Sequence, residues 1–284
     1  MNNDERVAQQ GQRQCHACQA HDPIKVGEAL WPHTWSCPAC GRKPQVNGAF
    51  LQLAPELDEG DAGYDIASFD FLAGHENQHF WFIARNELIE WLVRKFAAGA
   101  KTGLEIGCGT GFVLNAFKSA LPNARICGSE LHSSGLVHAS KRHLNTVELF
   151  QMDARKPGLS DALDLVGAFD VLEHIEEDQT VLRECARMLR PGGVLIATVP
   201  QHPWLWSSQD DIAHHVRRYE RGQLAERARQ SGLVPVYQSS FVTLAFPLMV
   251  ASRFVKGRGA DASRQREQVE AEFRIPKILN QLML

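Results

Sequence analysis

One short stretch, LEIGCGTG at residues 104–111, constrains the fold of this 284-residue chain more than any other. Its apolar start, Leu104 and Ile106, is typical of the end of a buried strand, and residues 112–121 have the pattern of a helix. Three glycines at two-residue spacing lie between these elements. Glycine adopts torsions that other residues resist and lets a ligand approach the backbone closely. We therefore expect a strand, a ligand-binding turn and a helix whose N-terminus faces the ligand.

The glycine spacing distinguishes this turn from a dinucleotide-binding turn. Dinucleotide-binding proteins usually carry G-x-G-x-x-G, whereas this chain has E-x-G-x-G-x-G. The carboxylate of Glu105 would repel a pyrophosphate but would tolerate a ligand that carries an ammonium and a sulfonium group. The stretch resembles motif I of the class I S-adenosylmethionine-dependent methyltransferases. The resemblance implies that S-adenosylmethionine is bound by Glu105, Gly107, Gly109 and Gly111.

Acidic residues follow the next two predicted strands. Residues 125–130 form a predicted strand that ends at Glu130, and residues 147–152 form another that is followed by Asp153 and Ala154. An acid at the end of the second strand can accept hydrogen bonds from both ribose hydroxyls, although a solvent-exposed carboxylate is the weaker alternative. The resemblance implies that Asp153 accepts from the adenine amino group and that the backbone N–H of Ala154 reaches a ring nitrogen.

The fourth predicted strand, residues 164–169, leads into the run Asp170-Val-Leu-Glu173-His174. This run resembles one found in many small-molecule methyltransferases, including the ubiquinone-biosynthesis O-methyltransferases. It lies where the methyl group and its acceptor should meet, at the carboxyl edge of the sheet. His174 is the best-placed general base because imidazole titrates near neutrality, and Glu173 is a second catalytic candidate. The resemblance places Asp170 near the cofactor.

The matching acids and histidine of the ubiquinone-type relatives are associated with a divalent metal. In this chain the corresponding residues would be Asp170, Glu173 and His174. We favour the alternative, in which Glu173 and His174 cap the next helix and shape the pocket.

A loop rich in aromatic and basic residues follows the fifth predicted strand, residues 194–199. The run Leu-Arg-Pro-Gly-Gly before that strand is a further methyltransferase signature. The loop, residues 201–219, suits a small-molecule pocket because aromatic walls with a few polar groups are typical of such pockets. We expect His215 to be a second candidate base there, and the alternative is a solvated surface loop. The candidate substrate-binding residues are His202, Trp206, His214, Arg217, Arg218 and Tyr219.

Three consecutive aromatic residues, 80–82, begin a predicted helix that runs to about residue 98. In methyltransferases the segment before the first strand commonly covers the cofactor. The resemblance therefore implies that Trp81 and Arg85 cover the methionine end, with Arg85 pairing with its carboxylate. Plain packing is an equally weighted alternative.

Two Cys-x-x-Cys pairs near the N-terminus predict a metal site. The thiolates of Cys15, Cys18, Cys37 and Cys40 match the tetrahedral ligand set of structural Zn²⁺, and the segment resembles a zinc ribbon. Four protein ligands leave no open position for water or substrate, so we expect a structural site rather than a catalytic one. The remaining cysteines fall in predicted core elements and are expected to be inert.

The resemblance implies an α/β fold, a Rossmann-like doubly wound and mostly parallel sheet with a small N-terminal zinc-ribbon module. We also expect a sixth strand at residues 233–241, and we find no seventh strand after it. Residues 243–255 and 264–284 are predicted to be helical. The predicted organisation is a zinc ribbon at 13–54, an acidic linker at 55–74, a methyltransferase domain at 75–241 and a C-terminal helical extension at 242–284.

Composition narrows the classes of function. A formal net charge of −3 and a pI near 6.5 give no global reason to expect a nucleic-acid partner. The N-terminus lacks the apolar core of a signal peptide, and no apolar run is long enough for a membrane span, so we expect a cytoplasmic protein.

The leading hypothesis is methyl transfer to an oxygen, nitrogen or carbon nucleophile of a small molecule. One alternative is an RNA methyltransferase whose zinc ribbon recognises the substrate. The other is a non-catalytic, cofactor-binding regulator whose ribbon docks on a protein. A homodimer or a partner protein could bind through the ribbon or the C-terminal helices.

Overall fold

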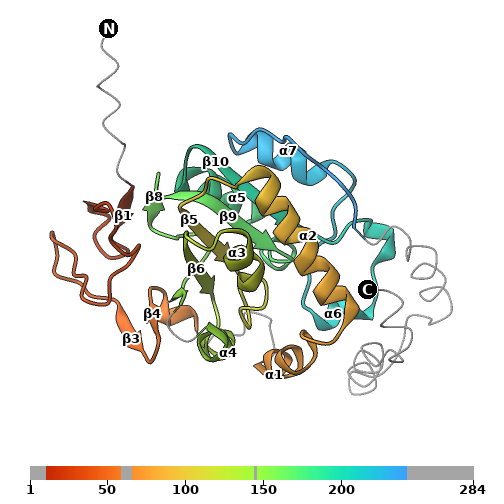
Figure 1. Ribbon diagram of the computed structural model, residues 1–284, viewed down its shortest axis with the longest axis horizontal. Coiled ribbons are helices and arrows are strands. Elements are labelled where there is room, and N and C mark those ends of the chain that lie inside the picture. The colour runs from red at the N-terminus through yellow and green to blue at the C-terminus, as the bar shows by residue number, and fades with distance from the viewer. Residues whose placement is uncertain (1–10, 59–65, 144–145, 242–284) are drawn as a thin grey trace, which may run out of the picture.

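The computed structural model describes residues 11–58, 66–143 and 146–241 (Figure 1). A seven-stranded sheet forms its centre, and every neighbouring pair is parallel except β3 and β4. The predicted α/β fold with a mostly parallel sheet is therefore confirmed. From one edge to the other the strands are β10 (Leu189–Thr198), β9 (Leu163–Phe169), β5 (Thr102–Ile106), β6 (Arg125–Glu130), β7 (Glu148–Gln151), β4 (Phe50–Gln52) and β3 (Gln45–Asn47).

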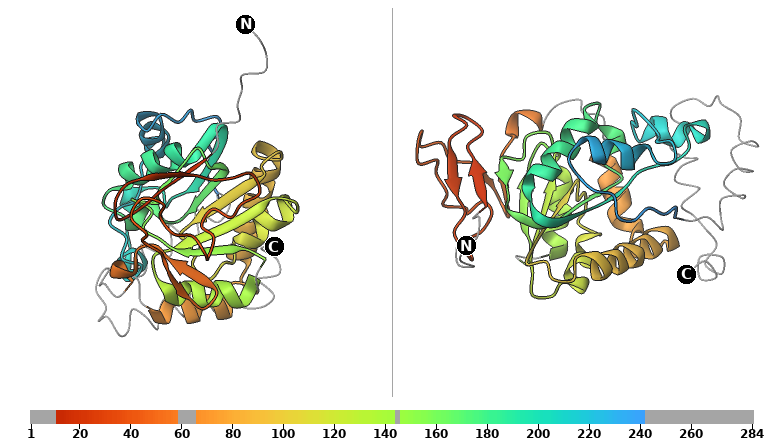
Figure 2. Two further views of the ribbon diagram at one scale, coloured as in Figure 1. Left: turned by 90° about the vertical axis from the view of Figure 1, so that its left-hand side faces the viewer. Right: turned by 90° about the horizontal axis from the view of Figure 1, so that it is seen from above.

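Helices cover both faces of this sheet (Figure 2). Successive strand residues point to opposite faces, so Ile126 and Cys127 of β6 belong to two different buried clusters. The cluster of Ile126 contains residues of α2 (Phe80–Phe96), α3 (Leu114–Ala120) and α4 (Ser133–His143). The cluster of Cys127 contains residues of α5 (Asp178–Met188), against which α7 (Gln223–Gln230) packs.

The cysteine-containing segment shares this core. Its first strand, β1 (Gln12–Gln14), pairs with both β2 (His21–Pro23) and β8 (Leu159–Ser160), and β4 pairs in parallel with β7. Trp31 and Leu51 lie in the same buried cluster as Leu104 and Val166 of the central strands. From the sequence we expected a separate ribbon module. The structure differs because the ribbon completes sheets whose other strands come much later in the chain.

Two other expectations differ from the structure. Residues 55–74, expected to be a linker, contain the 3-10 helix η1 (Pro55–Leu57) and most of α1 (Ile66–His75), whose Phe69 is buried. The sixth strand expected at 233–241 is wrong, because these residues form no strand. Val234 and Val236 are 82% and 75% exposed there, and Pro235 between them has no N–H to pair.

The predicted C-terminal helices, 243–255 and 264–284, lie outside the described residues. Within the part that the structure describes, no helix has both the length and the apolar character needed to cross a membrane.

Candidate functional site

The glycine loop connects β5 to α3 at the carboxyl edge of the sheet. Gly107, Gly109 and Gly111 all have positive φ, at 65°, 51° and 77°. A Cβ atom at Gly107 would lie 2.4 Å from Cγ2 of Val171, a residue that follows β9. The loop thus requires glycine for its backbone conformation and, at Gly107, also for lack of space.

Replacing Gly107 with alanine is expected to destabilise the protein by about 2–5 kcal/mol, because a left-handed conformation costs ~1–2 kcal/mol and overpacking ~1–3 kcal/mol. Gly192→Ala is the matched control, since Gly192 has φ 84° but no heavy atom within 4 Å of the position that a Cβ would take. Urea unfolding of both variants measures the difference. Equal stability of the two variants would show that Val171 does not restrict the loop.

Two acids lie beside the glycine loop, Glu105, which is buried, and Glu130, which is half-buried. Glu130, at the end of β6, accepts hydrogen bonds from the backbone N–H groups of Gly109 at 3.0 Å and Leu131 at 2.8 Å. Glu105 is buried in β5, and its Oε2 has no hydrogen-bond partner among the described residues. Burial raises the pKa of both carboxyls, that of Glu105 well above its usual range. A cationic ligand beside them would favour their ionised forms.

Asp153 lies two residues beyond β7 and is buried, like its neighbour Ala154. Its carboxylate accepts hydrogen bonds from the backbone N–H of Arg155 at 2.9 Å and from Nε of the same residue at 3.0 Å. These contacts hold Asp153 at the same sheet edge as Glu130. Its predicted bond to the adenine amino group stays a prediction.

Trp81 and Arg85 of α2 lie against the end of β9. The Arg85 guanidinium forms an ion pair with Asp170, and its Cζ lies 4.6 Å from the centroid of the Trp81 ring. The resemblance implied that Arg85 pairs with the methionine carboxylate of the cofactor, with plain packing as an equally weighted alternative. In the structure its charge is directed to Asp170, which also accepts a hydrogen bond from the Thr198 hydroxyl.

A buried contact that was not predicted from the sequence fixes the glycine loop from outside. Glu76, between α1 and α2, accepts the hydroxyl of Thr110 at 2.7 and 2.6 Å and also pairs with Arg142 of α4. Arg142 Nε in turn donates to the Thr110 carbonyl. In the sequence, the polar run before the aromatic residues 80–82 was the feature that could have indicated this contact.

The three predicted catalytic residues come together. Glu173 and His174 lie in the 3-10 helix η2 (Leu172–His174), and the ring of His174 lies 4.8 Å from that of His215, nearly perpendicular to it. One side-chain ligand atom from each of the three residues lies within 4.8 Å of the others. The backbone N–H of Val216 donates to the Glu173 carbonyl at 2.8 Å and so fastens the 201–219 loop to η2.

Burial sets the charge of this cluster. Glu173 is only 1% exposed, neither carboxyl oxygen has a partner among the described residues, and burial raises its pKa well above the usual range. Burial, with a contribution from His215, lowers the pKa of His174 to about 4. His174 is therefore neutral at neutral pH and able to accept a proton.

The expected helix-capping role of Glu173 is wrong, because its oxygens are unpartnered among the described residues and the residue that precedes α5 is Glu177. A carboxylate and two imidazoles, those of Glu173, His174 and His215, could also hold a divalent cation. Asp170 is outside this group, since its carboxylate contacts Arg85 and Thr198.

Most candidate substrate-binding residues of the 201–219 loop have partners within the protein. The Tyr219 hydroxyl donates to Asp178 at 2.7 Å, Arg217 donates to the Ile175 carbonyl at 2.5 Å, and Arg218 pairs with Asp210. The Trp206 indole donates to Asp211, and the backbone N–H of His202 donates to the Tyr219 carbonyl, whereas His214 is exposed. These contacts anchor the loop, and contact with an acceptor stays a prediction.

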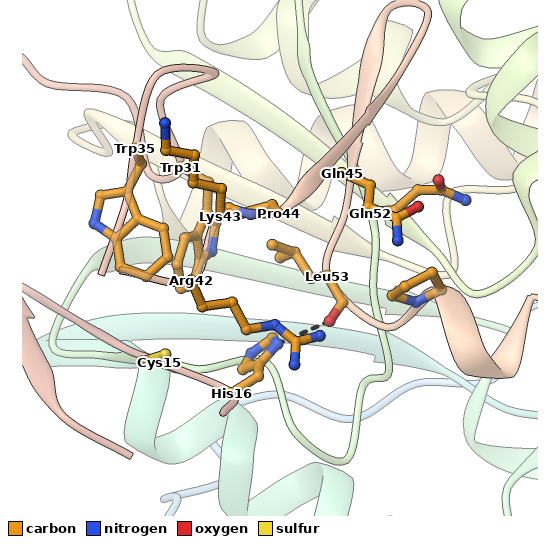
Figure 3. Close-up of a pocket in the computed structure, with 11 residues that line it drawn as sticks. Cys15, His16, Trp31, Trp35, Arg42, Lys43, Pro44, Gln45, Gln52 and Leu53 are labelled. Atoms are coloured by element: carbon orange, nitrogen blue, oxygen red, sulfur yellow. Dashed lines mark hydrogen bonds between the residues drawn. The ribbon is translucent and has the colours of Figure 1, made fainter. Parts of the chain in front are cut away.

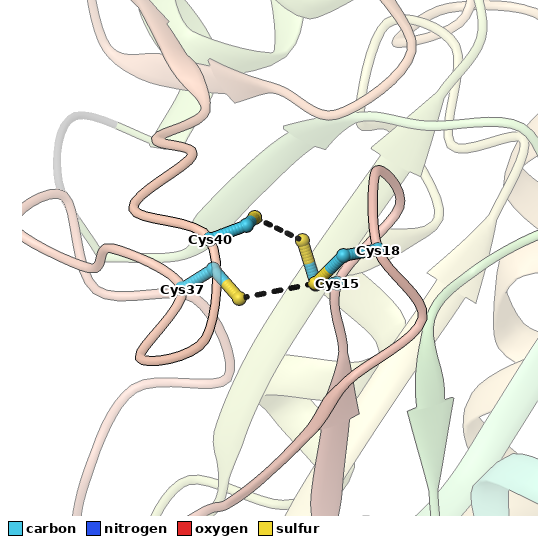
Figure 4. Close-up of side chains that lie close together, drawn as sticks. All are labelled: Cys15, Cys18, Cys37 and Cys40. Carbon is cyan, nitrogen blue, oxygen red and sulfur yellow. Dashed lines mark hydrogen bonds between the residues drawn. The ribbon is translucent and has the colours of Figure 1, made fainter.

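The four N-terminal cysteines form a compact sulfur cluster (Figure 4). Cys15 Sγ lies 3.7 Å from Cys40 Sγ, and Cys18 Sγ lies 3.6 Å from Cys37 Sγ. A tetrahedron with Zn–S bonds of about 2.3 Å has S···S edges of about 3.8 Å. The sulfur positions therefore fit Zn²⁺.

A hollow of about 190 Å³ lies beside this cluster, between the ribbon and the end of β4 (Figure 3). Trp31 and Trp35 line it together with Arg42 and Lys43, which follow the second cysteine pair. Four thiolates around Zn²⁺ carry a net charge of −2, which two neighbouring cations offset. None of the predicted catalytic residues lines this hollow.

Comparison with known proteins identifies a methyltransferase domain. Residues 104–195 match the family described as a methyltransferase domain. The chain is 28% identical over 176 residues to a malonyl-[acyl-carrier protein] O-methyltransferase from Hahella chejuensis, covering 59% of this chain and 60% of that protein. It is also 28% identical over 155 residues to a ubiquinone biosynthesis O-methyltransferase from Pseudomonas putida, covering 49% of this chain and 64% of that protein. The match thus spans less than two thirds of either relative.

Solved structures share the fold. Phosphoethanolamine N-methyltransferase 2 from Haemonchus contortus, in complex with S-adenosyl-L-methionine, superposes with a TM-score of 0.51 at 18% identity, covering 67% of this chain and 47% of that one. A candidate sarcosine dimethylglycine methyltransferase from Galdieria sulphuraria gives a TM-score of 0.52 at 15% identity, covering 68% and 79%. Taken together, the glycine loop, the parallel sheet and the match over residues 104–195 show that the chain contains a methyltransferase domain.

Proposed function

We propose that this protein transfers a methyl group from S-adenosylmethionine to an oxygen of a small molecule. The observation that carries the proposal is the cluster of Glu173, His174 and His215 at the same sheet edge as the glycine loop. Two relatives named as O-methyltransferases support oxygen as the attacked atom.

Some residues of the site would bind the cofactor, and others would remove the proton of the acceptor. When bound, S-adenosylmethionine supplies an electrophilic methyl group on a sulfonium sulfur. The buried carboxyl of Glu105 suits its positive charge, and the half-buried carboxyl of Glu130 suits its ribose hydroxyls. The imidazole of His174, which burial keeps neutral, or that of His215 takes the proton of the acceptor hydroxyl. Positioning of donor and acceptor supplies much of the rate.

The contacts of the basic residues support a small acceptor over RNA. Binding of a nucleic acid relies on lysine and arginine side chains that neutralise phosphates. In the 201–219 loop the Arg217 guanidinium pairs with Glu176 and Asp178, and that of Arg218 pairs with Asp210. These guanidinium groups are neutralised within the protein, and the chain as a whole has a net charge of −3.

Incubation of cell extracts with methyl-labelled S-adenosylmethionine and the purified protein tests the proposal. We expect label in one low-molecular-weight product, identified by mass spectrometry. Label in the RNA fraction would favour the RNA methyltransferase alternative. Binding of S-adenosylhomocysteine without transfer to any fraction would favour the non-catalytic regulator.

Alanine at Glu130 or at Asp153 is expected to weaken binding of S-adenosylhomocysteine by about 1–3 kcal/mol each, because each change removes a hydrogen-bond acceptor that the bound ligand shields from water. Isothermal titration calorimetry measures the loss. Glu226→Ala is the control, since Glu226 is an exposed acid on α7 that pairs only with Arg229 and Gln230 among the described residues. Unchanged affinity in both site variants, or binding of NAD by the wild type, would refute the assigned cofactor site.

We also propose that Cys15, Cys18, Cys37 and Cys40 hold a structural Zn²⁺. The support is the sulfur geometry and the two-pair spacing. All four tetrahedral positions are then filled by protein, so this metal takes no part in methyl transfer.

A further inference from the structure

Asp210 is a fully buried acid within the 201–219 loop. It lies in α6 (Ser208–Ile212) and is 0% exposed. Its Oδ1 accepts from Nδ1 of His215 at 2.9 Å and from Nε of Arg218 at 2.6 Å. Its Oδ2 accepts from Nη2 of Arg218 at 3.0 Å and from the backbone N–H of Ser207 at 2.8 Å. A single carboxylate thus connects the start of α6, the candidate base and an arginine.

These contacts fix the protonation pattern of His215. Both oxygens of the Asp210 carboxyl accept hydrogen bonds from the Arg218 guanidinium, an arrangement that favours the ionised carboxylate. An ionised carboxylate can only accept hydrogen bonds, so Nδ1 of His215 must carry the hydrogen. In the neutral ring, the other nitrogen, Nε2, then has a free lone pair.

The position of the His215 ring determines which groups the Nε2 lone pair can reach. His215 meets Asp210 through Nδ1, so Nε2 is on the side of the ring turned away from α6. The His215 ring lies 4.8 Å from the His174 ring. One ring nitrogen of His215 also lies within 4.8 Å of a carboxyl oxygen of Glu173. Arg218 binds both oxygens of the Asp210 carboxylate and so restricts its rotation.

We propose that Asp210 is a positioning residue for methyl transfer, which holds His215 with Nε2 facing the acceptor. This inference rests on the proposed function. As the acceptor oxygen forms its bond to the methyl carbon, the carbon–sulfur bond breaks and its electron pair stays on sulfur. The hydroxyl proton passes to Nε2 of His215, and the resulting imidazolium is stabilised by the Asp210 carboxylate. The products are the methyl ether or ester, S-adenosylhomocysteine and one proton, which His215 releases to water.

A purely structural role for Asp210 must be separated from this one, because the residue also forms the capping box of α6 with Ser207. Ser207→Ala removes one capping contact and leaves the bond between Asp210 and His215. Asp211→Asn changes the neighbouring acid, which is exposed and accepts from Trp206. These two variants are the matched controls.

The first test needs no acceptor. Nitrogen-15 NMR of histidine-labelled protein, saturated with S-adenosylhomocysteine, reports which ring nitrogen of His215 carries the hydrogen. The His215 signal is assigned by its disappearance in His215→Gln. We expect the Nδ1–H form in the wild type, in Ser207→Ala and in Asp211→Asn, and its loss in Asp210→Ala. An Nε2–H form in the wild type would overturn the inference even if Asp210→Ala did not fold.

The second test measures turnover with labelled cofactor and the extract fraction that the wild type methylates. Asp210→Ala is expected to lower kcat by about 10²–10⁴-fold, the range that general-base catalysis contributes, with the Kd for S-adenosylhomocysteine unchanged. A rate equal to wild type, or an equal loss in Ser207→Ala, would refute the positioning role while leaving the proposed function intact. No transfer by the wild type would refute the proposed function itself, and the role of Asp210 with it.

Discussion

Replacing His215 or His174 with alanine is expected to lower the rate of methyl transfer by about 10²–10⁴-fold, because a general base contributes to catalysis on that scale. Both rings belong to the cluster assigned to the acceptor and not to the predicted cofactor-binding set, so the affinity for S-adenosylhomocysteine should stay within about twofold of wild type. A loss of kcat at constant cofactor affinity is the signature of a group that acts on the acceptor.

The measurement combines initial rates with calorimetry for each variant. His21→Ala is the control, since His21 is an exposed histidine of β2 in the ribbon. If both site variants methylate at the wild-type rate, the acceptor binds elsewhere and the cluster of Glu173, His174 and His215 has another role.

Loss of zinc is expected to destabilise the whole described fold and not the ribbon alone. Cys37→Ser removes one of four thiolates, and loss of a structural metal belongs to the few changes that cost more than about 4 kcal/mol. The ribbon strands β1 and β4 pair with β8 and β7, and Trp31 is buried in the core that contains Leu104. Unfolding of the ribbon therefore exposes part of the central core.

Urea unfolding, followed by circular dichroism, and elemental analysis check this prediction. We expect about one zinc per chain in the wild type, none in Cys37→Ser, and an earlier unfolding transition in the variant. Val26→Ser is the control, because Val26 lies in the same segment and is 91% exposed. Wild-type protein with no metal, or a disulfide between the cysteine pairs, would refute the zinc site.

The same packing revises an expectation from the sequence. With the ribbon taken as a separate module, a chain that begins near residue 70 should still fold and bind the cofactor. The structure predicts the opposite, because such a truncation removes β3 and β4 and exposes the edge of β7.

Local patterns in the sequence predicted the parts of the fold that local forces determine. The apolar runs at 104–106 and 164–169 are strands, and the Gly-rich turn between strand and helix has the positive φ angles that only glycine adopts easily. Because parallel strands end at one edge of the sheet, their order along the chain was enough to bring Glu130 beside Gly109.

The sequence could not predict which groups the polar side chains of the 201–219 loop bind. The run Arg217-Arg218-Tyr219 has the composition of a binding surface, yet all three side chains bind acids of their own chain, Asp178 and Asp210. Asp210 itself has the sequence context of a helix cap, and nothing nearby in the sequence indicates that it also holds His215.

The alternating apolar residues at 233–241 led to a wrong strand prediction for the same reason. The valines at 234 and 236 have the spacing of a strand, but their side chains are exposed and no strand lies beside them in the described residues. A strand needs a partner to satisfy its backbone, and such a partner is specified by the rest of the chain.

The pairing of β4 with β7 also sets an order of events on the ribosome. Translation at about 5–20 residues per second separates Leu51 from its partner Phe150 by roughly 5–20 s. All four cysteines are synthesised before Leu51, and therefore before the central strands that cover Trp31. If the four cysteines hold Zn²⁺ as proposed, the nascent ribbon can bind it first and present a preformed edge on which the later strands assemble. A cell starved of zinc during synthesis should accumulate misassembled chains even if zinc is restored after release.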